Sequence, residues 1–159
     1  MQRCKGFSLI ELIIVICLIA IIAAIAGLNL VNYTINRNLK SAARDIASDF
    51  AICKERAISG STTCRIIFVT GGNSYTIQDL LVGNPPAPGP VATKRLTEFG
   101  SDIVIQNTDF AGGPQVDFLA RGTTLQPGIN TVTLQNSRGS TATITVNTTG
   151  RTYVKPNII

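Results

Sequence analysis

Glu11 is the residue of this sequence whose position most clearly implies chemistry. It is a carboxylate near the start of a run that extends to Leu28 without another charge and consists almost entirely of leucine, isoleucine, valine and alanine. Counted from Phe7, the run is long enough to cross a bilayer as a helix. A charge inside such a segment costs roughly 2.5–3.5 kcal/mol on insertion scales. We therefore expect Glu11 to have a partner.

The residues before Phe7 suggest where that partner comes from. They include Arg3 and Lys5 and end in Gly6. Cleavage after Gly6 would make Phe7 the new N-terminus and place its ammonium group four residues from Glu11. The same cleavage would lower the formal net charge of the chain from +5 to +3.

This arrangement resembles the leader and cleavage site of type IV prepilins and type II secretion pseudopilins. Gly6 matches the end of the leader, Phe7 the first mature residue, and Glu11 the fifth mature residue. The resemblance implies that a membrane-embedded prepilin peptidase cleaves after Gly6 and methylates the amine of Phe7. It also implies that Glu11 pairs with the amine of a neighbouring subunit during filament assembly.

Two other interpretations of this region stay open. In a secretory signal peptide, Arg3 and Lys5 would form the basic region and cleavage would follow Ala26, although a glutamate in the apolar region is unusual. In an uncleaved anchor the chain would keep Met1, and Glu11 would have no explanation.

The basic residues ahead of the apolar run favour an N-terminus in the cytoplasm and an exported body. Together with the resemblance, they imply a single-pass protein of the bacterial inner membrane with a periplasmic C-terminal domain, which assembles into a periplasmic or surface filament. Cys53 and Cys64 would then lie in an oxidising compartment, where a disulfide can persist. We expect this bridge to tie the end of the helix to the first strand, with two buried free thiols as the alternative.

Helical periodicity continues beyond the apolar run. No proline occurs before Pro85, so a helix can extend from about Phe7 toward Ser59, with Gly27 as a weak joint or within an unbroken helix. We expect residues 7–30 to form a membrane-spanning or filament-core half and residues 31–60 an amphipathic half, with the charged residues, including Asp45 and Asp49, mostly on its exposed side. The apolar stripe of the second half has steps of three and four residues and consists of Ile35, Leu39, Ala42, Ile46, Phe50, Cys53 and Ala57.

Residues 61–159 are rich in β-branched residues and turn signals, which predicts an antiparallel β domain. Residues 62–70 and 74–81 form a predicted hairpin across Gly71-Gly72-Asn73. The proline-rich residues 84–90 are expected to form an irregular loop. Further short strands are predicted at 103–106, 116–119, 131–135, 141–146 and 152–155. The expected class is α+β, a long N-terminal helix packed on a C-terminal antiparallel sheet domain.

The order of the later segments is similar to that of the H-type minor pseudopilins (GspH) and the FimT-like minor pilins. The resemblance covers almost the whole chain, and it rests on Val116-Asp117-Phe118, Thr131 to Leu134, Ile144-Thr145-Val146 and Gly150-Arg151 behind the leader. It implies a pilin-like fold and a structural subunit of a type II secretion or type IV pilus filament. The implied partners are other pilin or pseudopilin subunits, the prepilin peptidase and the inner membrane.

Signals of enzymatic chemistry are absent from the sequence. The chain has no histidine, and its nine carboxylates are mostly isolated, so no acid–base pair stands out. Asp109 with Gly112-Gly113 lacks the acidic spacing of a strong calcium loop. We therefore expect no catalytic residues, no cofactor and no metal site.

DNA uptake is the alternative function, because some FimT-like pilins bind DNA through a Gly-Arg-x-Arg sequence. Here Gly150-Arg151-Thr152-Tyr153 keeps the first arginine and has tyrosine at the second position. Arg138, Arg151 and Lys155 could gather on one face and contact nucleic acid, or they could be three solvated charges near strand ends. A third possibility is an unrelated anchored β domain that never polymerises.

Overall fold

The computed structural model describes the backbone of residues 8–81 and 87–159, and the side chains of these residues apart from 25–30, 87 and 88. The chain forms two compact units, Met1–Ile35 and Asn36–Ile159. One helix, α1 (Leu9–Gly60), contributes residues to both units and continues without a break through Gly27. Each unit is described by itself below.

The second half of α1 has one buried face. Its buried apolar residues recur every three or four positions, which brings them onto one side of the helix. They are less than 2% exposed, and they are Leu39, Ala42, Ile46, Phe50, Cys53 and Ala57. The predicted apolar stripe is therefore present in the second unit, and Ala43 adds to it.

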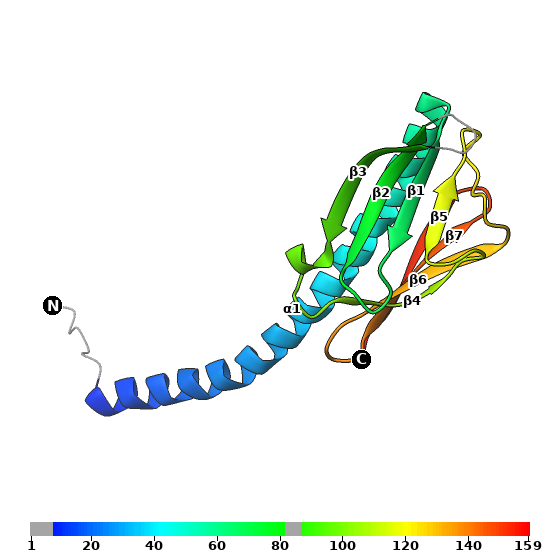
Figure 1. Cartoon of the computed structure of the whole chain (residues 1–159). Coiled ribbons are helices and arrows are strands. Elements are labelled where there is room, and N and C mark those ends of the chain that lie inside the picture. The colour runs from blue at the N-terminus through cyan, green and yellow to red at the C-terminus, as the bar shows by residue number, and fades with distance from the viewer. Residues whose placement is uncertain (1–7, 82–86) are drawn as a thin grey trace. The chain divides into compact units, whose positions relative to one another are not determined.

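In the residues that the structure describes, eight strands and one short helical turn complete the second unit (Figure 1). They form two four-stranded antiparallel sheets, one in the order β3-β2-β1-β5 and the other in the order β4-β6-β7-β8. The elements are β1 (Thr63–Phe68), β2 (Ser74–Leu81), β3 (Ala87–Arg95), η1 (Leu96–Glu98), β4 (Val104–Asp109), β5 (Gln115–Phe118), β6 (Ile129–Gln135), β7 (Thr141–Asn147) and β8 (Thr152–Asn157).

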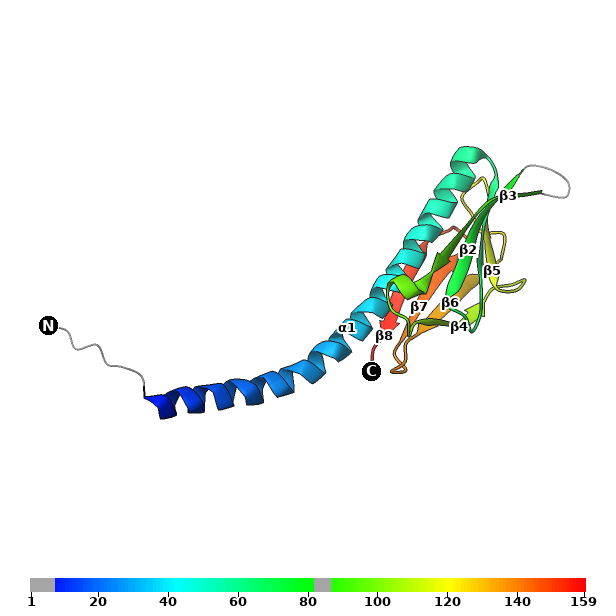
Figure 2. The same ribbon diagram turned by 60° about the vertical axis from the view of Figure 1, so that its left-hand side comes forward.

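The core lies where the buried face of α1 meets the inner faces of the sheets (Figure 2). Along strands β1, β6 and β7, every second residue is buried and the residues between them are partly or fully exposed. This alternation is expected when one face of a sheet is covered. Phe50 of α1 packs on Phe68 at a centroid distance of 6.0 Å and on Phe118 at 5.9 Å. The predicted α+β class is confirmed, and the β domain contains two sheets.

The region 84–90 differs from the prediction. Residues 87–90 begin β3, which pairs with β2 at the edge of its sheet, whereas residues 84–86 lie outside the described residues. Proline donates no backbone hydrogen bond, but an edge strand needs only half of its donors for its neighbour. Pro88 and Pro90 therefore fit into a strand that the sequence pattern indicated as a loop.

The turn after β1 joins the two sheets. Gly71 has a φ of +79°, a region that favours glycine. The Gly71 amide donates to the carbonyl of Ile105 in β4, and the Ile105 amide donates to the carbonyl of Gly72, each at 2.8 Å. The Gly-Gly turn of the predicted hairpin thus covers the outer edge of β4 at Ile105.

Candidate assembly site

The first unit presents an apolar helix surface that nothing in the described chain covers. Every described side chain from residue 8 to residue 24 is exposed, including Leu9 at 75% and Ile22 at 66%. Glu11 lies in the first turn of α1 and is the single charged residue of this stretch. Among the residues that the structure describes, it has no ion-pair partner.

Gly6 and Phe7, the predicted cleavage and methylation site, lie outside the described residues. Over the described parts of the chain, no helix is both long enough and apolar enough to cross a membrane. Among the described residues of this unit, Cys17 is a free cysteine, and it is exposed.

The structure brings the predicted cysteine pair together. Cys53 of α1 and Cys64 of β1 form a disulfide with a Cα–Cα distance of 5.5 Å, and both residues are fully buried. The bond closes a loop with a sequence separation of 11 residues. By the loop-entropy model, a crosslink of this size stabilises the folded state by about 3 kcal/mol.

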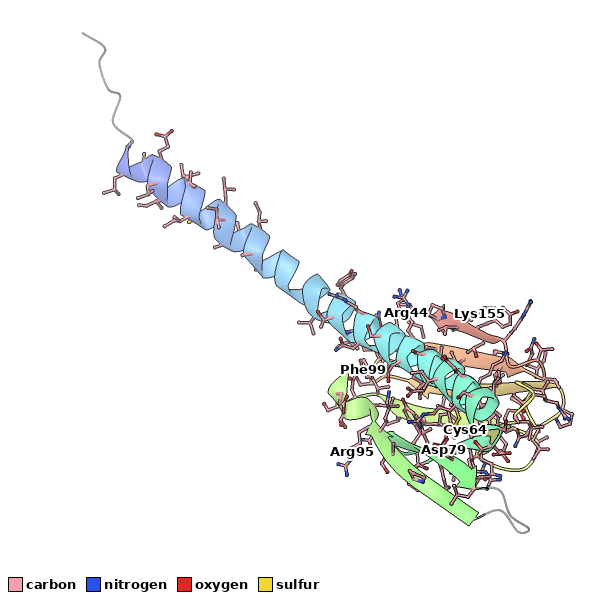
Figure 3. All side chains as sticks on the ribbon, turned by 90° about the horizontal axis from the view of Figure 1, so that it is seen from above. Arg44, Cys64, Asp79, Arg95, Phe99 and Lys155 are labelled. Carbon is pink, nitrogen blue, oxygen red and sulfur yellow. A yellow bond between two sulfur atoms is a disulfide. The ribbon has the colours of Figure 1, made fainter. Side chains whose placement is uncertain are left out.

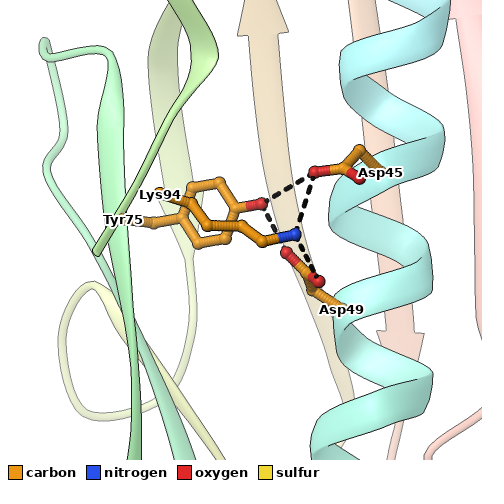
Figure 4. A network of polar contacts seen from close by, with 4 residues as sticks. All are labelled: Asp45, Asp49, Tyr75 and Lys94. Atoms are coloured by element: carbon orange, nitrogen blue, oxygen red, sulfur yellow. Dashed lines mark hydrogen bonds and ion pairs between the residues drawn. The ribbon is translucent and has the colours of Figure 1, made fainter. Parts of the chain in front are cut away.

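A polar network fixes α1 to the edge of the β3-β2-β1-β5 sheet (Figure 4). The Tyr75 hydroxyl donates to Asp49 Oδ2 at 2.6 Å and lies 3.3 Å from Asp45 Oδ2. Lys94 Nζ donates to Asp49 Oδ1 at 2.8 Å and is 3.3 Å from Asp45 Oδ2. Asp49 is 2% exposed, so the expectation that it lies on the exposed side of the helix is wrong.

The partners of Asp49 explain why a carboxylate is stable at this depth, because both of its oxygens accept hydrogen bonds. Burial, together with the hydrogen bond to Asp49, raises the pKa of Tyr75 far above its ordinary value. Burial lowers the pKa of Lys94, but the hydrogen bonds and charges of Asp49 and Asp45 outweigh this effect, and the net shift is upward. The spacing of Asp45 and Asp49, one helical turn apart, was the available signal that they share a partner.

A second, partly buried ion pair links β1 to β5. Arg65 donates to both oxygens of Asp117, from Nε at 2.7 Å and from Nη2 at 2.8 Å. The two residues are direct cross-strand neighbours, and Asp117 is 1% exposed. The hydrogen bond to Asp117 raises the pKa of Arg65. This pair and the Asp49 network both connect elements within the second unit. They therefore stabilise the fold of that unit.

The three cations proposed for DNA contact are spread along the length of β7. Arg138 lies in the turn before β7, and Arg151 follows the turn after it, so the two lie at opposite ends of that strand. A strand of this length spans about 24 Å. Lys155 lies between them, opposite Thr143. The expectation of charges near strand ends holds for Arg138 and Arg151, whereas Lys155 lies within β8.

No group of three metal-binding side chains occurs among the described residues. Asp109 ends β4, and the nearby Gly112 and Gly113 have positive φ values in the connection to β5. This segment is a turn between strands.

Two family models match the sequence. Residues 42–150 match the model described as Type II transport protein GspH. Residues 1–27 match the model of the prokaryotic N-terminal methylation motif. A comparison with curated protein sequences finds no match.

Solved structures show the same fold. The minor pseudopilin EpsH from the type 2 secretion system of Vibrio cholerae is 12% identical, with a TM-score of 0.59, and the match covers 75% of this chain and 97% of EpsH. The type IV minor pilin FimU of Pseudomonas aeruginosa is 17% identical, with a TM-score of 0.58, and the match covers 78% of this chain and 92% of FimU.

Proposed function

This chain belongs to the GspH family of type II transport proteins, and from this premise we propose that it is a minor subunit of a type II secretion pseudopilus or a type IV pilus, made as a precursor that is cleaved after Gly6. The proposal rests on one observation above all. Glu11 is a single carboxylate on an exposed apolar helix, and it lies within residues 1–27, which match the N-terminal methylation motif.

The charge of Glu11 affects the free energy of the membrane-inserted precursor and that of the assembled subunit differently. In lipid, its charge costs roughly 2.5–3.5 kcal/mol. Cleavage after Gly6 creates an ammonium group on Phe7, and a neighbouring subunit can bring its own such group to Glu11. The pair leaves lipid together, and charge pairing offsets the desolvation of both groups. The carboxylate therefore favours assembly of processed chains over insertion of isolated ones.

The apolar surface of the first unit supports the same role. Side chains such as Leu9, Ile14 and Leu18 are exposed along the helix, and exposed apolar surface of this extent is typical of membrane or protein contacts. We infer that it lies in the inner membrane before assembly and in the filament core afterwards, with the second unit on the periplasmic side. Arg3 and Lys5 support this orientation.

N-terminal sequencing and intact mass measurement of the membrane-extracted protein test the processing step. A methylated Phe7 at the N-terminus would support cleavage after Gly6. A chain that begins at Gly27 would instead indicate a signal peptide, and a chain that keeps Met1 would indicate a plain anchor.

The role of Glu11 is tested by Glu11→Leu in a strain that assembles the filament. We expect membrane insertion to be unchanged and incorporation into sheared or purified filaments to fall at least about tenfold, because the neighbouring amine would be buried without a partner. Glu98→Leu, which removes an exposed carboxylate from the second unit, is the matched control. Normal incorporation of Glu11→Leu would show that this carboxylate has no part in assembly.

DNA uptake is not proposed as a second function. Arg138 and Arg151 lie at opposite ends of β7 with Lys155 between them, so these residues form no concentrated basic patch that would favour DNA binding.

A further inference from the structure

The four outer edges of the two sheets are not equally protected. An edge strand with free backbone groups can pair with another chain, and proteins usually block such edges. Edge strand β3 contains Pro88 and Pro90. Edge strand β5 is covered by the following segment, in which the Leu125 amide donates to the carbonyl of Asp117 at 2.8 Å. The edge of β4 is covered at Ile105 by the Gly71-Gly72 turn.

The outer edge of β8 has no such cover. Among the described residues, no backbone hydrogen bond reaches β8 from a segment other than β7. The Asn147 amide donates to the carbonyl of Arg151, which fixes the phase of the ladder. Because hydrogen-bonded and non-hydrogen-bonded pairs alternate, the amides and carbonyls of Thr152 and Val154 point away from β7. Pro156 also faces away from β7, but proline has no backbone amide hydrogen to donate. The free edge therefore offers donors only at Thr152 and Val154.

A groove borders this free edge. It has a volume of about 860 Å³ and lies between α1 and β8. On the helix side its floor is made by small side chains, Ala47, Ser48 and Ala51, and on the strand side it is lined by Gly150 and Thr152. The small helix residues leave room for the side chains of a further strand beside β8.

Gly150 contributes to the shape of this groove. Its φ is +69°, and a Cβ atom at this position would lie 2.7 Å from the carbonyl oxygen of Gly122. Lys54 Nζ donates to the carbonyl of Thr149 at 3.0 Å, which holds the turn after β7 against α1. The groove is therefore a defined feature of the second unit and not a gap between loosely placed elements.

The charges around the groove are mostly positive. Arg44 and Lys54 line it, with Glu55 as the opposing charge. Arg44 and Lys155 lie on the side of the domain where β8 borders the helix (Figure 3). The last carboxylate side chain of the sequence is Asp117, so β6, β7 and β8 contain none. A second copy of β8 would add further positive charge, whereas a segment with carboxylates would complement it.

We propose that the free edge of β8 and the groove beside it bind an extended, carboxylate-bearing segment of a neighbouring filament subunit by strand addition. Backbone hydrogen bonds to Thr152 and Val154 would supply affinity, the groove would accept alternate side chains, and the cations would select acidic sequences. The inference rests on the proposed function only in taking another subunit as the source of the segment. The binding site itself belongs to the second unit and does not involve Glu11.

The test uses the full chain in detergent micelles and a short peptide in which glutamate alternates with valine or threonine. A peptide of the same pattern with lysine in place of glutamate is the control. We expect the glutamate peptide to bind, to bind more weakly as salt rises, and to slow hydrogen exchange at the Val154 amide. Failure of the glutamate peptide to bind, equal binding of both peptides, or binding without protection of Val154 would overturn the proposal.

Two pairs of variants sharpen the test. Val154→Pro removes the outward donor and leaves the bonds to β7 intact, so peptide affinity should fall about tenfold, while Val154→Ala keeps the donor and should bind nearly as the parent does. Arg44→Glu should weaken binding several-fold, whereas Arg95→Glu in β3 makes the same charge change at another edge and should not. Unchanged affinity in Arg44→Glu would contradict the charge selection even where Val154→Pro fails to fold. Because this binding assay does not require a filament, a negative result would overturn the strand-addition proposal without contradicting the proposed role of Glu11 in assembly.

Discussion

Glu11 and Asp49 lie on the same helix but are stabilised in different ways. Glu11 is exposed on an apolar surface and has no ion-pair partner in the described part of the chain. Asp49 is buried, and Tyr75 and Lys94 satisfy both of its oxygens. Apolar side chains in the two halves of the helix differ in exposure in the same direction. Ile16 in the first half is 56% exposed, whereas Phe50 in the second half is 1% exposed.

The difference shows which requirements are met within the chain and which are left for other molecules. In the second unit, apolar residues on α1 recur at a helical period and the sheets cover them, so folding alone buries them. In the first unit, apolar side chains lie on all sides of the helix. Packing against a single surface, such as the face of a sheet, would leave part of them exposed. Under the function proposed above, lipid or other subunits cover the first unit, and its carboxylate pairs with a charge from outside this segment. The following predictions test this division.

Truncation of a core residue should have the largest effect. We expect Phe50→Ala to lower the free energy of unfolding of the second unit by about 3–5 kcal/mol, because the substitution leaves a cavity among the packed aromatic rings. Ile16→Ala, on the exposed helix, should leave this free energy unchanged. Denaturant unfolding of both variants in detergent micelles, monitored by circular dichroism of the β domain, measures the contrast. Similar losses in the two variants would remove the distinction between the halves of α1.

Neutralisation of the two carboxylates should separate stability from assembly. Asp49→Asn should destabilise the second unit by about 2 kcal/mol, since charged hydrogen bonds to Tyr75 and Lys94 would be weakened. Glu11→Gln should leave the unfolding of the domain unchanged and should impair filament incorporation. Unfolding curves and filament fractions of both variants provide the comparison, and a loss of domain stability in Glu11→Gln would contradict it.

Alkaline pH should weaken the network around Asp49. Tyrosine in the unfolded chain loses its proton near pH 10, whereas the raised pKa of Tyr75 keeps the folded state protonated there. Above about pH 10 the unfolded state thus binds fewer protons, and stability falls with pH by up to about 1.4 kcal/mol per unit from this group. Lys94, whose pKa is also raised, adds a dependence of the same sign above about pH 10.5.

Stability measured from about pH 8 to about pH 11 in Tyr75→Phe should therefore decrease less steeply than in the parent. Tyr153→Phe, which changes an exposed tyrosine, is the matched control. Identical pH profiles for Tyr75→Phe and the parent would exclude Tyr75 as the titrating group.

The smallest effect is expected at the end of α1. Ser61 has a φ of +49°, and the Thr62 amide donates to the carbonyl of Ala57 at 3.1 Å, a helix-ending geometry in which glycine is the usual residue. Ser61→Gly should raise the free energy of unfolding by about 0.5 kcal/mol, because relief of strain slightly exceeds the entropy gained by the unfolded chain. The midpoint of thermal unfolding measures this change, and a lower midpoint would contradict it.

Much of the fold could be predicted from local patterns. The stripe from Leu39 to Ala57 and the strand from Ser74 to Leu81 depend on periodicity within short segments, and the structure contains both. The pairing of Cys53 with Cys64 could be proposed because the two residues flank one predicted turn. Each of these features depends on residues that are close in sequence.

The features that were missed depend on partners far along the chain. The burial of Asp49 follows from Lys94, 45 positions away, and no local pattern reveals that distance. The strand β3 was mistaken for a loop because Pro88 and Pro90 are compatible with a strand only at a sheet edge. The position of Lys155 between Arg138 and Arg151 required the β7–β8 register, which the sequence does not specify.

The Cys53–Cys64 bond also determines how a pulling force would travel through the subunit. Tension applied along α1 passes at Cys53 directly into β1 through a covalent link, so the helical residues after Cys53 are bypassed. From Cys64 the load spreads sideways, because β1 is hydrogen-bonded to β2 on one side and to β5 on the other. Two strand ladders then share the shear, and the last two turns of the helix can remain wound while the filament is under tension.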